Sequence, residues 1–498
     1  MSGPAALAGI EDVTGGSGVA PPVEALLPIG VRHRQLRVRT LLLGMMLTLE
    51  DARPAHLTRV HQAPTALPAV DQARPGIVEE WKAGPHQLTC RQAGYTFNLV
   101  TDALAKDEPD GAPSGDLTRA CDGLLEASIP AQHKDASAAL AAGWTDVESW
   151  SRPPPRGTTG CADPEAHWGH RNSSLPGPKG GMFFGYYLSA ATMTRDENGP
   201  PVPGLARPMT LTSCALDPVR AFAKVLTSMP AAGIPLGGIL DDSGYAHRDA
   251  EAWAIPLRQA GAQLIQDLHP SDRGPKGTHH GAIIAIGCLY CPQTPRLLLE
   301  PGPLPPAAAP DDIAAHDQQT AELATHKLGR ITAGDAGGYH RVMCPAVMGK
   351  IRCPLRPEPV TLDRCRPEIL TPPASPPACC AQQTITVPPD VTAKTRQKHD
   401  YPSKEHRRSY ARRTGSERTF STIKDPAATT IARGWCRLMG VTPLALWIAC
   451  LLAVRNQRIL AAWDARQADT ARRAAAGLPP RTRKRRRKTL ASLAAGPP

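Results

Sequence analysis

The feature that most constrains the fold is an ordered run of apolar segments between residues 136 and 270. Two β-prone segments come first, at residues 139–147 and 182–193, and the second reads MFFGYYLSAATM. Aromatic and apolar residues in short runs favour strands. The segments that follow are a predicted helix at 218–229, a strand at 234–240, a helix at 249–261 and a strand at 263–268. Strands followed by alternating helices and strands predict an α/β domain with a mixed sheet.

Changes in composition divide the chain of 498 residues into six parts. We expect a disordered N-terminus at 1–30, a mostly helical domain with possible DNA-binding function at 31–135, the first part of the α/β domain at 136–270, a β- and loop-rich insertion at 271–400, the second part of the α/β domain at 401–465, and a basic tail at 466–498. The insertion is predicted because helical periodicity fades after residue 270 and proline, cysteine and short β-like runs replace it.

The basic charge is concentrated in the last fifth of the chain. Residues 401–498 hold 21 lysines and arginines against 5 acidic residues, whereas the first 400 residues carry a net charge of −4. Such an asymmetry predicts a polyanionic partner, and nucleic acid fits it best.

Export and membrane signals are missing from the sequence pattern. The N-terminus has no cationic stretch followed by an apolar core, and the apolar run at 441–454 is too short to span a bilayer, so it predicts a buried helix. Thirteen irregularly spaced cysteines indicate reduced thiols. We therefore expect a cytoplasmic protein with no membrane partner.

Residues 403–424, SKEHRRSYARRTGSERTFSTIK, form a predicted helix with an unusual stripe. Tyr410, Arg413, Glu417 and Lys424 project within an arc of about 60° on a helical wheel. A core-facing stripe would be aliphatic. One carboxylate among cations suits a metal-dependent phosphodiester site, and the alternative is a solvated basic helix with i,i+4 pairs.

The same four residues resemble a known family signature. Their spacing, Y-x2-R-x3-E-x6-K, is similar to that of bacterial insertion-sequence transposases of the DDE type. Asp242-Ser-Gly-Tyr resembles the second motif of that family, and Gly185-Tyr-Tyr-Leu resembles its G-Y-x-L strand. The resemblance covers roughly residues 136–465.

The resemblance implies a ribonuclease H-like fold interrupted by an insertion, and cleavage and joining of transposon ends with Mg²⁺ or Mn²⁺. It implies that Asp242 and Glu417 bind the metals, and that Tyr410, Arg413 and Lys424 position DNA. The protein would assemble as a homo-oligomer on the transposon ends and target DNA.

The first acid of the family pattern is displaced in this chain. Aligning the usual Asp-x-Thr on Thr145 places Gly143 where the acid belongs, and Asp146 is the nearest substitute. An odd offset along a strand points a side chain to the opposite face unless a bulge or the end of the strand redirects it. Two hypotheses follow: an active enzyme that uses Asp146 as catalytic and metal ligand, or a catalytically defective DNA-binding remnant.

The cysteines of the insertion suggest a separate metal hypothesis. Cys288 and Cys291 form a C-x2-C pair that Cys344 and Cys353 could complete as a zinc site, although the eight-residue spacing of the second pair is unfavourable. The pairs His279-His280 and Cys379-Cys380 add ligand types without a pattern. Buried free cysteines are the plainer interpretation. The aromatic residues Trp144, Tyr245 and Trp435 are expected in the core, with base stacking as the alternative.

Overall fold

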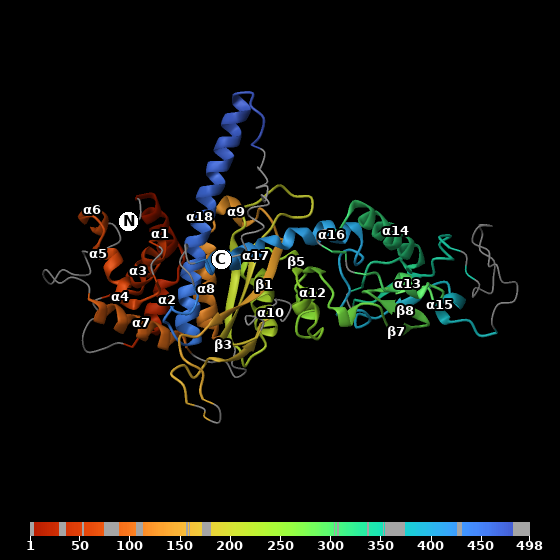
Figure 1. The fold of residues 1–498 in the computed structure, drawn as a ribbon, viewed down its shortest axis with the longest axis horizontal. Coiled ribbons are helices and arrows are strands. Elements are labelled where there is room, and N and C mark those ends of the chain that lie inside the picture. Colours follow the sequence, from red (N-terminus) through yellow and green to blue (C-terminus); the bar gives the residue numbers. More distant parts are fainter. Residues whose placement is uncertain are drawn as a thin grey trace, which may run out of the picture.

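The computed structural model contains three regions arranged along its long axis (Figure 1). A group of N-terminal helices lies at one end, a mixed sheet lies in the middle, and the insertion lies at the other end. The structure describes all residues except 1–3, 29–35, 52–53, 74–88, 106–112, 156–157, 159, 172–180, 303, 306–307, 336–337, 352, 354–373, 426–430 and 482–498.

The described part of the N-terminal region is mostly helical, beginning at Pro4. Its helices are α1 Pro4–Gly16, α2 Ala20–Leu26, α3 Val38–Glu50, α7 Cys90–Leu104 and α8 Gly115–Ala127, with the short helices α4 Leu57–Val60, α5 Gln62–Thr65, α6 Ala69–Ala73 and α9 Ala131–Lys134. Thr89 and Gln92 form a capping box at the start of α7, which satisfies two backbone N–H groups.

The prediction of a disordered segment at residues 1–30 was wrong for its described part. Helices α1 and α2 bury Leu7, Ile10, Val13 and Val23 in the same core as α3 and α8. Small and glycine-rich composition suggested disorder, but apolar residues three or four apart give α1 one buried face.

The central sheet runs in the order β2-β3-β1-β5-β6, and β4 also pairs with β3. Its strands are β1 Leu140–Glu148, β2 His167–His170, β3 Met182–Met193, β4 Ala206–Ser213, β5 Gly238–Asp241 and β6 Gln263–Gln266. Strand β3 is antiparallel to β1, β2 and β4, whereas β5 is parallel to both β1 and β6. The expected mixed sheet of an α/β domain is therefore present, with β1, β3, β5 and β6 close to the predicted strands, whereas β2 and β4 were not predicted.

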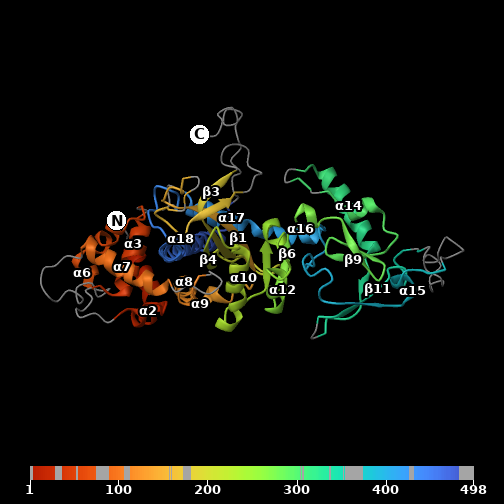
Figure 2. The same cartoon turned by 90° about the horizontal axis from the view of Figure 1, so that it is seen from below.

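Helices cover both faces of this sheet (Figure 2). On one face, α10 Pro218–Ser228 and α12 Ala254–Gln259 pack with Leu140 and Ala142 of β1. On the other face lie α17 Thr414–Ile423 and α18 Val441–Ala475, whose core contains Val147 and Tyr186. Glycine is required at position 185 of β3, because a Cβ there would lie 2.1 Å from the Val147 carbonyl oxygen of β1.

The described residues of the insertion form two small three-stranded sheets. One consists of β7 Pro275–His279, β8 Ala282–Ala285 and β9 Cys288–Tyr290, and the other of β10 Gly329–Arg330, β11 His340–Met343 and β12 Ile385–Val387. The helices of this region are α13 Arg296–Leu299, α14 Pro310–His326 and α15 Ala378–Ala381.

The segment after the insertion is helical but not uniform. Helix α16 Lys404–Tyr410 leads through a 3₁₀ turn at Ala411–Arg413 into α17. The hydroxyl of Ser403 accepts from the His406 N–H at 3.1 Å, which confirms the predicted start. The tighter 3₁₀ turn rotates residues after 413 relative to an ideal helical wheel.

Helix α18 continues well past the predicted boundary at residue 465. It continues to Ala475 because residues 466–475 contain no glycine or proline and are mostly alanine and arginine, which favour helices. It is long and apolar enough to cross a membrane, but 78% of its apolar window is buried inside the structure. The C-terminal part projects away from the body of the protein (Figure 1). Its apolar half is thus a core helix, consistent with a soluble protein.

Candidate active site

The ends of β1 and β5 lie side by side and carry the acidic motifs. Leu140 pairs with Ile239 and Ala141 with Leu240 in parallel register, so two residues later Gly143 comes level with Asp242. The glycine of the Asp242-Ser-Gly-Tyr motif is required by packing, because a Cβ on Gly244 would lie 2.9 Å from the Trp144 ring. The carboxyl ends of parallel strands are where open α/β sheets place ligands.

Arg413 joins the two acids that flank the insertion. Its guanidinium donates to Asp242 at 2.8 Å and to Glu417 at 3.1 Å. Asp242 also accepts from the Gly244 N–H at 3.0 Å as the N-cap of α11 Ser243–Ala246. The side chains of Asp242 and Glu417 remain 37% and 67% exposed. Two acids 175 positions apart in sequence thus share one cation at the surface.

Asp146 is held by two different cations. Lys424 donates to its Oδ1 at 2.8 Å, and Arg171 donates to its Oδ2 at 2.9 and 3.1 Å. Burial opposes ionisation of Asp146, but the two cations outweigh it and lower the pKa of the carboxyl. Arg171 also pairs with Glu148.

The face on which Asp146 lies is set by regular strand alternation. Strand β1 pairs with β3 from Leu140 to Glu148 without a register shift, so no bulge redirects Asp146. Alternation places it on the face of Leu140 and Ala142, and Lys424 reaches it from the end of α17. The signature lysine therefore contacts the proposed substitute acid.

Gly143 lies under α17 on the opposite face. A Cβ at this position would meet the Phe420 ring at 2.9 Å and the Ser416 hydroxyl at 3.4 Å. Phe420 thus fills the space next to the position where the family pattern places its first acid.

The structure brings the predicted residues to one sheet edge but not to one point. Within the described ranges, Asp146, Asp242 and Glu417 do not form a group whose ligand atoms all lie within 4.8 Å of one another. Each carboxylate instead neutralises a signature cation. Their oxygens are the ligands that Mg²⁺ and Mn²⁺ prefer, so the residue types fit such ions, provided that Arg413 and Lys424 release the acids.

The predicted aromatic residues have mainly structural positions. Tyr245 is fully buried and lies between Trp144 and Trp253, with ring centroids 4.6 and 4.4 Å away. Tyr410 packs against Ala139, Leu240 and Ile265 on the sheet, and burial raises the pKa of its hydroxyl. The core interpretation is confirmed for Tyr245.

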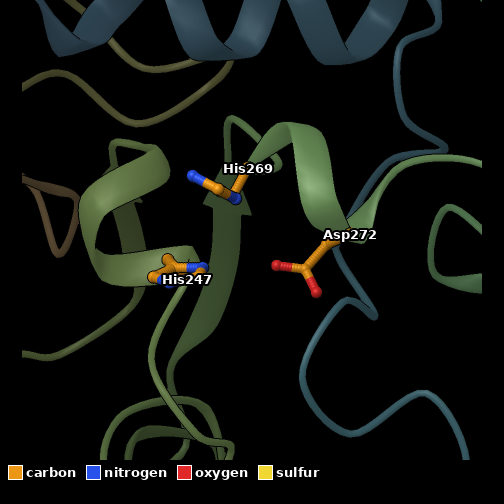
Figure 3. A group of neighbouring side chains, drawn as sticks. All are labelled: His247, His269 and Asp272. Atoms are coloured by element: carbon orange, nitrogen blue, oxygen red, sulfur yellow. The ribbon is translucent and has the colours of Figure 1, made fainter.

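A second group of metal-ligand types lies at the same edge of the sheet (Figure 3). His247 follows α11, and His269 and Asp272 follow β6; their ligand atoms lie within 4.8 Å of one another. Asp272 accepts from Lys394 at 2.9 Å through Oδ1, while its buried Oδ2 has no hydrogen-bond partner. Two imidazoles and a carboxylate suit a transition metal better than Mg²⁺.

Sequence reasoning did not identify Asp241 and Arg171 as part of this edge. Asp241 is fully buried, where Trp253 and Gln266 donate to it at 2.9 and 3.1 Å, and burial raises its pKa. The signal in the sequence was the pair Asp241-Asp242. Adjacent residues of a strand point to opposite faces, so the two acids could not both lie on the face of the candidate site. Arg171 carried no such signal.

Comparison with known proteins gives no match to any protein-family model, curated protein or solved structure.

Proposed function

We propose that this protein is a DNA transposase of the DDE type that cleaves and joins the ends of an insertion element. The observation that carries the proposal is the bridge from Arg413 to Asp242 and Glu417. This bridge places the Asp242-Ser-Gly-Tyr motif in direct contact with the Y-x2-R-x3-E-x6-K motif, although the insertion separates them in the sequence. The topology supports a ribonuclease H-like fold, with four strands in antiparallel pairing, β1 to β4, beside the two parallel strands β5 and β6.

In the proposed mechanism, Asp242, Glu417 and Asp146 would hold Mg²⁺ or Mn²⁺ at the sheet edge. When bound, such ions would supply Lewis-acid stabilisation of the charge that develops on the phosphodiester. When DNA binds, Arg413 and Lys424 leave the carboxylates and pair with DNA phosphates. The guanidinium of Arg413 suits this role because it can donate two parallel hydrogen bonds to one phosphate. Tyr410 supports this stretch by packing α16 on the sheet. Water attacks the phosphodiester at the end of the element and displaces its 3′-oxygen as a hydroxyl. This 3′-hydroxyl then attacks a phosphodiester of the target DNA and displaces the 3′-oxygen of the target strand.

Exposed charge supports DNA as the substrate. Lys404, Arg408 and Arg418 are exposed along α16 and α17 beside the acids. A net charge of +12 for the chain favours contact with phosphates. We further propose that the protein is cytoplasmic and acts as a homo-oligomer on DNA.

A second candidate is a DNA-binding remnant without cleavage activity. Gly143 is level with Asp242 and packed against Phe420, while Asp146 lies on the other face by alternation. Asp242 and Glu417 therefore have no third carboxylate from β1 on their own face of the sheet.

A strand-nicking assay with Mn²⁺ and DNA carrying the inverted repeats that flank the gene tests both candidates. The active enzyme nicks at the repeat ends, and Asp242→Asn, Glu417→Gln and Asp146→Asn each reduce the rate by more than a hundredfold. Glu405→Gln, an exposed acid on α16, is the matched control and leaves the rate unchanged. Binding without nicking supports the remnant, and neither binding nor nicking contradicts both.

A further inference from the structure

The loops that follow two neighbouring parallel strands bring two histidines and an aspartate together. Asp241 at the end of β5 pairs with Gln266 at the end of β6 in parallel register, so both strands end at the same edge of the sheet. His247 follows α11 after β5, and His269 and Asp272 lie in the turn after β6. The three side chains come from two separate segments, so the fold rather than local sequence brings them together.

The spacing of these side chains is close to that of a metal site. The Asp272 carboxylate points toward the two imidazole rings (Figure 3), and the three ligand atoms lie within 4.8 Å of one another. Tetrahedral ligation with bonds of about 2.1 Å sets ligand atoms about 3.4 Å apart, so each pair has to approach by at most about 1.4 Å. His247 is exposed, and exposed side chains change rotamer readily. Small side-chain rotations are therefore enough to close the site.

An unsatisfied carboxylate oxygen is a second and independent sign of a ligand. Oδ1 of Asp272 accepts from the Lys394 ammonium at 2.9 Å, while Oδ2 is buried and has no hydrogen-bond partner. The whole Asp272 side chain is only 13% exposed. A buried carboxylate oxygen without a donor is costly, and such an oxygen commonly marks the position of a water molecule or an ion.

The imidazole of His269 is held in a fixed orientation. Its Nδ1 accepts from the Ser271 N–H at 3.2 Å and lies 2.6 Å from the Ser271 hydroxyl. Partners of this kind orient the histidines of metal sites. The ring centroids of His247 and His269 are 4.1 Å apart, so one ion can reach both rings.

The donor atoms select the class of metal. Mg²⁺ prefers oxygen ligands, whereas imidazole nitrogens suit zinc and neighbouring transition metals. Two histidines and one carboxylate are an established zinc-ligand set, in which water takes the fourth position. The exposure of His247 gives solvent access to that position.

The location of the three residues gives such an ion a structural role. His247 lies five residues after Asp242, and His269 and Asp272 lie where the chain enters the insertion. Lys394, the partner of Asp272, lies near the end of the insertion. An ion at this point would tie the loop that carries Asp242 to the two chain segments that connect the insertion to the sheet.

We propose that His247, His269 and Asp272 bind a divalent transition metal ion of the zinc class, which fastens the base of the insertion to the sheet edge. Each neutral imidazole donates one nitrogen lone pair, Oδ2 of Asp272 is the third ligand, and water completes the coordination. Lys394 keeps its ion pair with Oδ1. This site is separate from the carboxylates proposed to act on DNA, and the proposal does not depend on DNA cleavage.

Zn²⁺ titration of the full-length protein, first stripped with a chelator, tests the proposal. His247→Asn and Asp272→Asn should each bind one ion per chain fewer than the wild-type protein, or bind it at least about tenfold more weakly. Co²⁺ at the same site should give visible d–d absorption without thiolate-to-metal charge transfer. A wild-type protein that binds no Zn²⁺, or two variants that bind it as the wild-type protein does, overturns the proposal.

Matched variants separate this site from the proposed DNA site. Asp249→Asn, on an exposed acid two residues from His247, and Asp242→Asn should both retain the ion. Loss of the ion in Asp242→Asn but not in His247→Asn contradicts the assignment.

Because a ligand variant could alter the fold, crystals of the wild-type protein soaked in Zn²⁺ provide a second measurement. An anomalous peak between His247, His269 and Asp272 at the zinc absorption edge is expected. Peaks only at cysteines, or only at Asp242 and Glu417, overturn the proposal.

Discussion

At the scale of single residues, packing explains positions that the family resemblance left open. In the sequence, Gly143 stands where the family pattern has its first acid. In the structure, Phe420 of α17 occupies the space that a side chain at position 143 would need. Glycine at this position therefore leaves room for the Phe420 ring to pack between α17 and β1.

Substitution of Gly143 tests that packing. Gly143→Ala should lower the free energy of unfolding by about 1–3 kcal/mol, because its Cβ would lie 2.9 Å from the Phe420 ring. Gly94→Ala in α7 is the control: nothing lies within 4 Å of its Cβ, and removal of a helical glycine should stabilise by about 0.5–1 kcal/mol. Urea titrations measure the free energy of unfolding of both variants. Equal changes in the two variants would argue against close packing of Phe420 on Gly143.

His406 should make stability depend on pH. Burial lowers its pKa from 6.5 to about 4, and its Nε2 lies 2.9 Å from the Gln266 carbonyl oxygen. The unfolded chain therefore binds the proton more readily, so stability falls as pH drops from about 6.5 towards 4, by up to about 3 kcal/mol.

The measurement is the free energy of unfolding in urea between pH 4.5 and 7.5. His406→Asn should flatten the acid side of the profile, whereas His170→Gln, on the exposed residue of β2, should leave its shape unchanged. A profile with the same slope in His406→Asn would show that other groups cause the pH dependence.

At the scale of elements, sequence patterns predicted most helices and strands of the α/β domain. The strands at 139–147, 182–193 and 263–268 coincide closely with β1, β3 and β6, because buried strands need continuous apolar runs. The pattern failed for α1 and α2, whose small residues resemble a linker until α3, α8 and α18 are present to bury them.

Removal of α1 and α2 tests whether they belong to the core. A chain starting at residue 28 should lose several kcal/mol of stability, because Leu7, Ile10, Val13 and Val23 are buried. The expected readout is a lower thermal midpoint or insoluble protein. A chain ending at residue 481 is the matched truncation and should unfold like the full-length protein. Unchanged stability after removal of both helices would restore the prediction of disorder.

At the scale of the whole molecule, the candidate site was only partly predictable. The spacing of Tyr410, Arg413, Glu417 and Lys424 identified one helix, but the pairing of each acid with a particular cation depends on how α17 crosses β1 and β3. Sequence alone also could not show that Cys288 lies apart from Cys291, Cys344 and Cys353, because their positions depend on the folding of an insertion with little periodicity.

The predicted basic tail gives a prediction for DNA binding. Most of it lies outside the described residues, and residues 482–498 contain six lysines and arginines and no acid. Their removal should weaken binding to duplex DNA and reduce the dependence of log Kd on log salt by up to about 5 units. Fluorescence anisotropy at several salt concentrations measures this slope. An unchanged slope would mean that the tail does not contact phosphates.

The most direct test of the central claim is to locate Mn²⁺ by anomalous scattering in crystals of the protein bound to DNA. We expect an ion between the carboxylates of Asp242 and Glu417, with Arg413 moved from these acids to a DNA phosphate. Occupancy by Asp146 of a third ligand position would support the active enzyme. Mn²⁺ only at His247, His269 and Asp272, with Arg413 still bridging Asp242 and Glu417, would contradict the proposed site.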